Sequence, residues 1–231
     1  MRPRDRILDA AMQVFRRHGF QRSSIEQTAE AAGLTRQALY HHFESKQALF
    51  RAVIEHVHEG AVTAEIAAVS AAESQGSGLA DILIAGISAR MKQFIASFDG
   101  SPHVEEIFSE HLLQARDLYQ KYAAHYAAQL AVIIERVCRR QKIALAPGMN
   151  AAELARCIEM AMHGAKTANP GMQPPEAFLR DLDIMVRMLV AGAVAPRAMA
   201  RPAKTIVKKS VAKQRKSASR KPPSKTPGGR R

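Results

Sequence analysis

Residues 24–43 read SIEQTAEAAGLTRQALYHHF, and this stretch decides the fold of the N-terminal part of the chain. Ser24 and Gln27 have the spacing of a capping box, which predicts a helix that begins directly after Ser24. Gly33 has no β-carbon and lets the chain turn sharply, and Thr35 is then a suitable N-cap for a second short helix. Two short helices joined by a tight turn predict a helix-turn-helix.

The second predicted helix, from Arg36 to about Phe43, divides its side chains between a core and a solvent face. A small residue is needed where the two helices cross, and Ala29 occupies that position. Leu34, Leu39 and Phe43 can supply the core. The remaining polar side chains are free to enter the major groove of DNA, which admits an α-helix. These side chains are Arg36, Gln37, Tyr40 and His41.

Apolar residues recur at helical spacing on both sides of this stretch. The spacing predicts a helix from Pro3 to about His18, stopped by Gly19, and another that begins at Lys46 after the cap Ser45 and reaches about Gly60. Further helical segments are predicted at about 61–73, 79–98, 103–141, 150–166 and 175–193, the long one dividing near Arg116. Few runs alternate apolar and polar residues, so we expect no sheet and predict an all-α fold.

The net positive charge of the chain, +13, comes from its C-terminal end. Of the 34 Lys and Arg residues, 13 follow residue 196, where there is no Asp or Glu; residues 1–196 hold 21 basic and 21 acidic residues. Lys, Ser, Ala and Pro dominate that end, a composition that does not bury enough apolar surface to fold. We therefore predict three parts: a head with the helix-turn-helix (1–50), a helical body (51–196) and a disordered basic tail (197–231).

Several classes of protein do not fit the sequence. Two cysteines, Cys138 and Cys157, fit a reducing compartment better than a disulfide scaffold. The N-terminal residues lack the unbroken apolar stretch of a secretory signal, and no run is long enough to span a membrane, so we expect a cytoplasmic protein. No phosphate loop, nucleophile motif or metal-ligand cluster stands out, and we expect no enzyme activity, no metal and no cofactor.

The head resembles the TetR-type transcriptional regulators over about residues 5–55. The resemblance rests on Ile7-Leu8-Asp9-Ala10-Ala11, Phe15, His18-Gly19-Phe20 and Ser24-Ile25, then on Ala29-Glu30-Ala31-Ala32-Gly33-Leu34-Thr35, and finally on Leu39-Tyr40-His41-His42-Phe43, Ser45-Lys46 and Leu49. One departure is Thr28, where the family usually has an aliphatic residue; a hydroxyl there is expected to loosen the packing of the helix.

The resemblance implies roles for matching residues of the head. Arg36 and Gln37 would contact base edges, Arg36 a guanine and Gln37 an adenine. Phosphate contacts would come from the helix N-termini and from side chains beside them. The phosphate-contacting set is Ser24, Thr35, Tyr40, His41 and Lys46.

The resemblance also implies a homodimer and an effector pocket in the body. The last two helices would form a four-helix bundle with a second copy, although Leu154, Ile158, Met162, Phe178, Leu182, Met185 and Leu189 also fit an ordinary core within one chain. An apolar or amphipathic small molecule would be the effector. The expected pocket residues are Met91, Phe94, Phe98, Phe108, Tyr119, Tyr122 and Met160.

These observations favour a ligand-responsive regulator, a repressor by resemblance, that binds a palindromic operator in double-stranded DNA as a dimer. The alternative is a nucleoid-associated protein that coats DNA through its basic tail, since Lys and Arg attract phosphate without regard to sequence.

Overall fold

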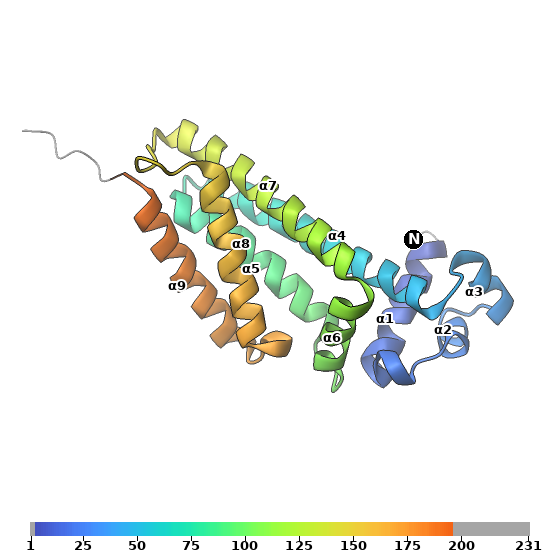
Figure 1. Cartoon of the computed structure of the whole chain (residues 1–231). Helices are drawn as coiled ribbons and strands as arrows, with labels where there is room; N and C mark the ends of the chain where they lie inside the picture. Colours follow the sequence, from blue (N-terminus) through green and yellow to red (C-terminus); the bar gives the residue numbers. More distant parts are fainter. Residues whose placement is uncertain (1–2, 196–231) are drawn as a thin grey trace, which may run out of the picture. The chain divides into compact units, whose positions relative to one another are not determined.

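The computed structural model describes residues 3–195, and these residues form an all-α fold (Figure 1). The predicted disordered tail, 197–231, lies outside the described residues. One isolated antiparallel bridge, Leu145 to Val194, is the only extended pairing within 3–195. The helices are α1 (Pro3–Arg22), α2 (Ile25–Ala31), α3 (Arg36–His42), α4 (Lys46–Ser74), α5 (Leu79–Phe98), α6 (Val104–Gln114), α7 (Arg116–Gln141), α8 (Ala151–Ala168), the 3₁₀ turn η1 (Pro170–Met172) and α9 (Pro175–Ala193).

The first three helices and the start of α4 share a small core. The rings of Phe15, Phe20 and Phe50 pack together, with centroids 4.7 Å apart for Phe20 and Phe50 and 5.4 Å apart for Phe15 and Phe50. Leu39 from α3 is fully buried beside them. Aromatic clusters of this kind bury much apolar area, which lets so short a segment hold a defined shape.

The predicted stop at Gly19 is correct, although α1 resumes for one turn beyond it. Gly19 has φ 76° and ψ 171°, a conformation that is almost exclusive to glycine. The chain therefore kinks there before it reaches Arg22. The predicted break near Arg116 is also found, because α6 ends at Gln114 and α7 begins at Arg116.

The predicted stop at Gly60 is wrong, since α4 continues through it to Ser74 (Figure 1). Buried side chains keep helical spacing across the glycine, with Val57 and Ala61 on either side and Val69 further on. Burial of this stripe against α5 outweighs the helix-breaking tendency of one glycine, which is about 1 kcal/mol. As a result, one continuous helix belongs to both the head and the body.

The body is a layered bundle in which α5 packs against α4, α7 and α9, and α8 packs between α7 and α9. One ion pair is enclosed in it: Arg90 of α5 donates to Glu65 of α4 at 2.9 Å, with side chains only 6% and 3% exposed. The Arg90 guanidinium also lies 4.4 Å from the ring centroid of Tyr126. Between residues 3 and 195, no helix combines the length and apolar character that a membrane span requires.

Candidate functional site

The helix-turn-helix is built by local capping, as predicted. The Ser24 hydroxyl accepts from the Gln27 N–H at 3.2 Å, and the Gln27 side chain accepts from the Ser24 N–H at 2.8 Å. In the turn, Gly33 has φ 67°, where a side chain would be strained. The Thr35 hydroxyl then accepts from the Ala38 N–H at 3.1 Å. These bonds satisfy helix-end donors and fix where α2 and α3 begin.

Thr28 does not loosen this unit as expected. Its side chain is completely buried, and its hydroxyl donates to the Ser24 carbonyl within the same helix at 3.3 Å. The polar atom is thus satisfied locally while the methyl group packs into the core.

The outer face of α3 carries four of the residues predicted to contact DNA. Arg36, Gln37, Tyr40 and His41 are all exposed. The Arg36 guanidinium pairs with Glu26 of α2 at 2.7 Å and lies 5.5 Å from the Tyr40 ring centroid. Both side chains of the ion pair are at least half exposed. Arg36 can therefore exchange Glu26 for another acceptor with little loss of free energy.

Lys46 was also predicted to hold phosphate, but its ammonium is engaged inside the head. Nζ donates to the carbonyls of Phe20, Gln21 and Ser23 at 2.9, 3.2 and 3.1 Å. It also lies 4.6 Å from the Phe20 ring centroid. Since an ammonium has three donors, Lys46 joins the end of α1 to the start of α4 in this structure.

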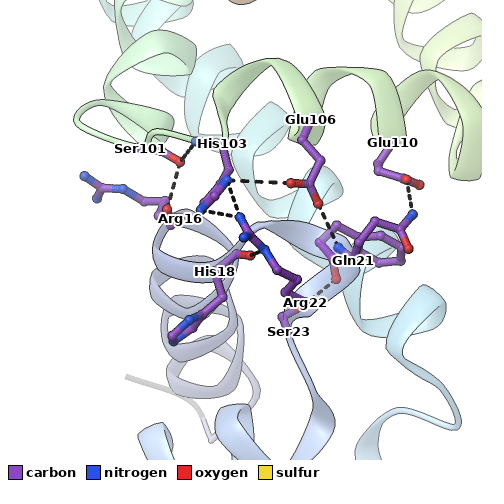
Figure 2. A network of polar contacts seen from close by, with 10 residues as sticks. Arg16, His18, Gln21, Arg22, Ser23, Ser101, His103, Glu106 and Glu110 are labelled. Atoms are coloured by element: carbon purple, nitrogen blue, oxygen red, sulfur yellow. Dashed lines mark hydrogen bonds and ion pairs between the residues drawn. The ribbon is translucent and has the colours of Figure 1, made fainter.

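A network of polar contacts connects the end of α1 to α6 (Figure 2). The Gln21 N–H donates to Glu106 at 2.8 Å, and the Gln21 side chain donates to Glu110. On the other side of the kink, Ser101 donates its hydroxyl to the Arg16 carbonyl at 2.8 Å. Figure 2 shows that both acidic side chains point from α6 towards the chain after Gly19.

A second contact ties α4 to the junction of α6 and α7. Arg51 of α4 donates to both carboxylate oxygens of Asp117 at 2.7 and 2.6 Å and to the Gln114 carbonyl at 2.8 Å. Hydrogen bonding to Arg51 is the main reason that the pKa of Asp117 is lowered to about 2. The helix α4, which runs from the head into the body, is therefore held to the junction of α6 and α7.

A cavity of about 280 Å³ lies in the body among α4, α5, α6, α8 and η1. We call it the α6–α8 cavity. A smaller hollow of about 30 Å³ adjoins it and shares four of its lining residues. The cavity is lined by His58, Phe94, Glu105, Phe108, Ser109, His111, His163, Lys166, Thr167, Asn169, Gly171 and Met172.

The structure brings most of the expected pocket residues to this region. Phe94 and Phe108 line the cavity, and Phe98 packs on both, with ring centroids 5.5 and 5.4 Å away. Met91 and Tyr122 line the smaller hollow. The side chain of Tyr119, also expected in the pocket, lies outside the described part of the structure.

Met160 does not belong to the pocket. It is 56% exposed and lines neither hollow, because its position on α8 faces away from the helices packed behind it. Ile184 and Met188 on α9 are also exposed, at 49% and 70%. By contrast, Leu154, Ile158, Met162, Phe178 and Leu182 form core within the chain, while Met185 and Leu189 are partly buried against it.

Sequence reasoning missed the polar side chains that line the cavity, among them His58, His111 and Lys166. Lys166 follows Met162 by one helical turn on the inward face of α8, and this spacing was the available signal. Burial, then repulsion from His111, lowers the pKa of His58 to about 2, and burial lowers that of His111 to about 4. Burial is also the main reason that the pKa of Lys166 falls to about 8.

Comparisons with known proteins agree with this geometry. Residues 7–53 match the model of the bacterial regulatory proteins, tetR family. The repressor NicS of Pseudomonas putida is 42% identical over 57 residues, which is 25% of this chain and 27% of that protein. The Escherichia coli repressor ComR is 42% identical over 52 residues, or 22% and 25% of the two chains. The matches thus span about a quarter of the length of these relatives.

The fold extends the similarity to the body. SmeT, the repressor of a multidrug efflux pump of Stenotrophomonas maltophilia, has a TM-score of 0.58 at 23% identity, over 83% of this chain and 90% of its own. FadR of Thermus thermophilus, a TetR-family repressor solved with lauroyl-CoA, has a TM-score of 0.56 at 19% identity, over 85% and 98%. At such identities the shared property is the fold.

The head is therefore of the helix-turn-helix class of DNA-binding domains found in transcriptional regulators. Residues 7–53 thus form a TetR-type head, and the described chain as a whole shares its fold with repressors such as the Thermus thermophilus protein.

Proposed function

We propose that this protein is a ligand-responsive repressor that binds a palindromic operator as a homodimer. The observation that carries the proposal is the outer face of α3, where Arg36, Gln37, Tyr40 and His41 are exposed on a short helix whose start is fixed by the Thr35 cap. A rigid helix with exposed polar side chains is what readout in a major groove requires.

The proposed contacts follow the chemistry of these side chains. Arg36 leaves Glu26 to donate two bonds to a guanine, and Gln37 pairs with an adenine. Tyr40 and His41 contact phosphates. The hydroxyls of Ser24 and Thr35, with the N–H groups behind them, add phosphate contacts at the starts of α2 and α3.

Dimerisation is proposed to occur through the outer faces of α8 and α9. Met160, Ile184 and Met188 supply exposed apolar area on these helices, and such area is suited to contact with a second copy. A two-fold dimer would place two copies of α3 on two half-sites, so the operator would share the symmetry of the protein. In this proposal the head (1–50) reads DNA, and the body (51–196) binds the effector and the second copy of the chain. The tail (197–231) adds a sequence-independent attraction to phosphate.

The α6–α8 cavity is the proposed effector site, and α6 links it to the head. Phe108 and His111 of α6 line the cavity, while Glu106 and Glu110 of the same helix bond Gln21. A ligand that displaces α6 would therefore disturb the end of α1, and through Arg51 also α4. The lauroyl-CoA bound by the Thermus thermophilus protein supports an amphipathic ligand in a body of this fold.

Selection of genomic DNA fragments by the full chain tests the proposal. The parent protein should enrich a palindromic sequence, and the variant Arg36→Ala/Gln37→Ala/Tyr40→Ala should lose this selectivity. A matched control is Gln120→Ala/Arg139→Ala, which removes exposed polar side chains from α7. If the triple variant selects the same DNA as strongly as the parent, α3 does not read the operator and the proposal fails.

A further inference from the structure

The α6–α8 cavity is lined by both aromatic rings and polar side chains. Phe94 and Phe108 pack against each other, with ring centroids 5.5 Å apart and an angle of 32° between their planes, and Met172 also lines the cavity. His58 and Lys166 supply polar groups to the wall shared with the smaller hollow. A ligand that fills the whole space must therefore combine an apolar body with a polar group.

The Lys166 ammonium has no carboxylate or carbonyl partner among the described residues. Nζ lies 6.0 Å from the centroid of the Phe94 ring. Burial is the main reason that its pKa falls to about 8, with repulsion from Arg90 acting in the same direction and Glu159 opposing it. A positive charge with so little compensation is stabilised by an anion placed beside it.

His58 gives a second, independent indication of a ligand. The residue is only 7% exposed, and neither nitrogen of its ring has a hydrogen-bond partner among the described residues. The ring is held flat against Tyr122, with centroids 4.2 Å apart and an angle of 14°. Buried polar atoms are nearly always hydrogen-bonded, so a fixed imidazole N–H here calls for an acceptor.

The other charged groups around Lys166 do not replace this acceptor. Arg90 is bound to Glu65 at 2.9 Å and is turned towards Tyr126. Glu159 lines the smaller hollow, and Glu105 is exposed where it borders the cavity. His111 and His163 also line the cavity.

We propose that the effector is a small organic anion, a monocarboxylate whose carboxylate binds Lys166 and His58 and whose apolar body lies against the rings of Phe94 and Phe108 that line the cavity. This inference rests on the proposed function, since it names the class of ligand for the same site. The cavity volume is near the lower limit of about 300 Å³ for pockets that enclose small molecules, which favours a compact acid with one ring or a short chain.

Calorimetric titration of the full chain with acids and their matched neutral amides tests the inference. The probes are benzoate, phenylacetate and octanoate, each compared with benzamide, phenylacetamide and octanamide. The protein variants are Lys166→Met, which keeps most of the side chain but removes the charged ammonium, and the control Lys92→Met, which alters an exposed residue of α5. Circular dichroism establishes that each variant is folded.

At least one acid should bind the parent at least about tenfold more tightly than its amide, since a charge-assisted bond is lost in the amide. Lys166→Met should abolish this preference, and Lys92→Met should preserve it. If Lys166→Met does not fold, titration of the parent at pH 7.5 and 9.5 decides instead, because loss of the ammonium should weaken acid binding on the order of tenfold. Equal binding of acids and amides, or no binding of any acid, overturns the inference.

The proposed function is judged separately by the effect of the same compounds on operator DNA. If an amide binds and releases DNA while its acid does not, the effector mechanism stands and the anion assignment is wrong. If acids bind through Lys166 but leave operator binding unchanged, the anion site stands and the effector mechanism is wrong.

Discussion

The N–H of Gln21, at the end of α1, donates to Oε1 of Glu106 on α6 over 2.8 Å (Figure 2). The bond forms just after the kink at Gly19, and a β-carbon at Gly19 would collide with the same carboxylate. Since Phe108 of α6 lines the α6–α8 cavity, one short helix touches both this cavity and the head. The head is thereby physically connected to the interior of the body.

Substitution Glu106→Ala should loosen this connection. Loss of a charge-assisted acceptor should speed hydrogen exchange of the Gln21 amide on the order of tenfold. Hydrogen–deuterium exchange followed by mass spectrometry of the segment 19–23 measures the effect. Glu135→Ala, an exposed glutamate of α7, is the control and should leave that segment unchanged. Unaltered exchange in Glu106→Ala would show that α6 does not restrain the end of α1.

Lys46→Met should destabilise the head without removing a phosphate contact. The ammonium donates to three carbonyls, and losing these bonds should lower the free energy of unfolding by about 2 kcal/mol, measured in urea. The slope of log affinity for operator DNA against log salt should stay the same. A slope that falls by about one unit would instead mean that Lys46 contacts a phosphate.

The buried pair of Arg90 and Glu65 should be far more costly to break than to replace. Glu65→Leu leaves the Arg90 guanidinium unpaired among buried side chains and should destabilise the protein by about 3–5 kcal/mol. The double variant Glu65→Leu/Arg90→Met should recover most of that loss in urea unfolding. Arg187→Met, which removes exposed bonds to Asp81 and Asp183, should have no resolvable effect. A double variant as unstable as the single one would show that the pair has a further role in α4–α5 packing.

Stability should decline as the pH falls below 7 because His58 and His111 are buried in their neutral forms. Their pKa values in the folded protein, about 2 and about 4, lie below the ordinary value of 6.5. At a pH between the folded and the unfolded pKa of a histidine, the unfolded chain binds more protons than the folded protein. Each of the two histidines therefore lowers the free energy of unfolding by up to about 1.4 kcal/mol as the pH falls from 6 to 5. The stabilising contribution is complete above about pH 7.

The variant His58→Phe checks the source of this pH dependence. A phenyl ring can keep the contact with Tyr122 but cannot bind a proton, so the free energy of unfolding should fall less steeply with pH than in the parent. His125→Phe changes an exposed histidine and should retain the parent's slope. Identical slopes for all three proteins would exclude His58 as a contributor.

The sequence by itself determined the local structure of the head. The capping pair Ser24 and Gln27, the turn at Gly33 and the cap at Thr35 all lie where the pattern predicts them. Such features depend on hydrogen bonds and dihedral angles within a few residues, which is why the helix-turn-helix and the all-α fold could be predicted. The aromatic wall of Phe94, Phe98 and Phe108 followed from helical spacing in the same way.

Only the tertiary structure decided where polar groups and helix faces meet across the fold. It bonds Lys46 to the end of α1, carries α4 past Gly60, turns Met160 outward and brings His58 and Lys166 to one cavity. Periodicity gives the inward face of a helix but not the helix it packs against, nor the depth at which a charged group is buried. His58 and Lys166 are 108 positions apart and line one cavity, a juxtaposition that no local pattern encodes.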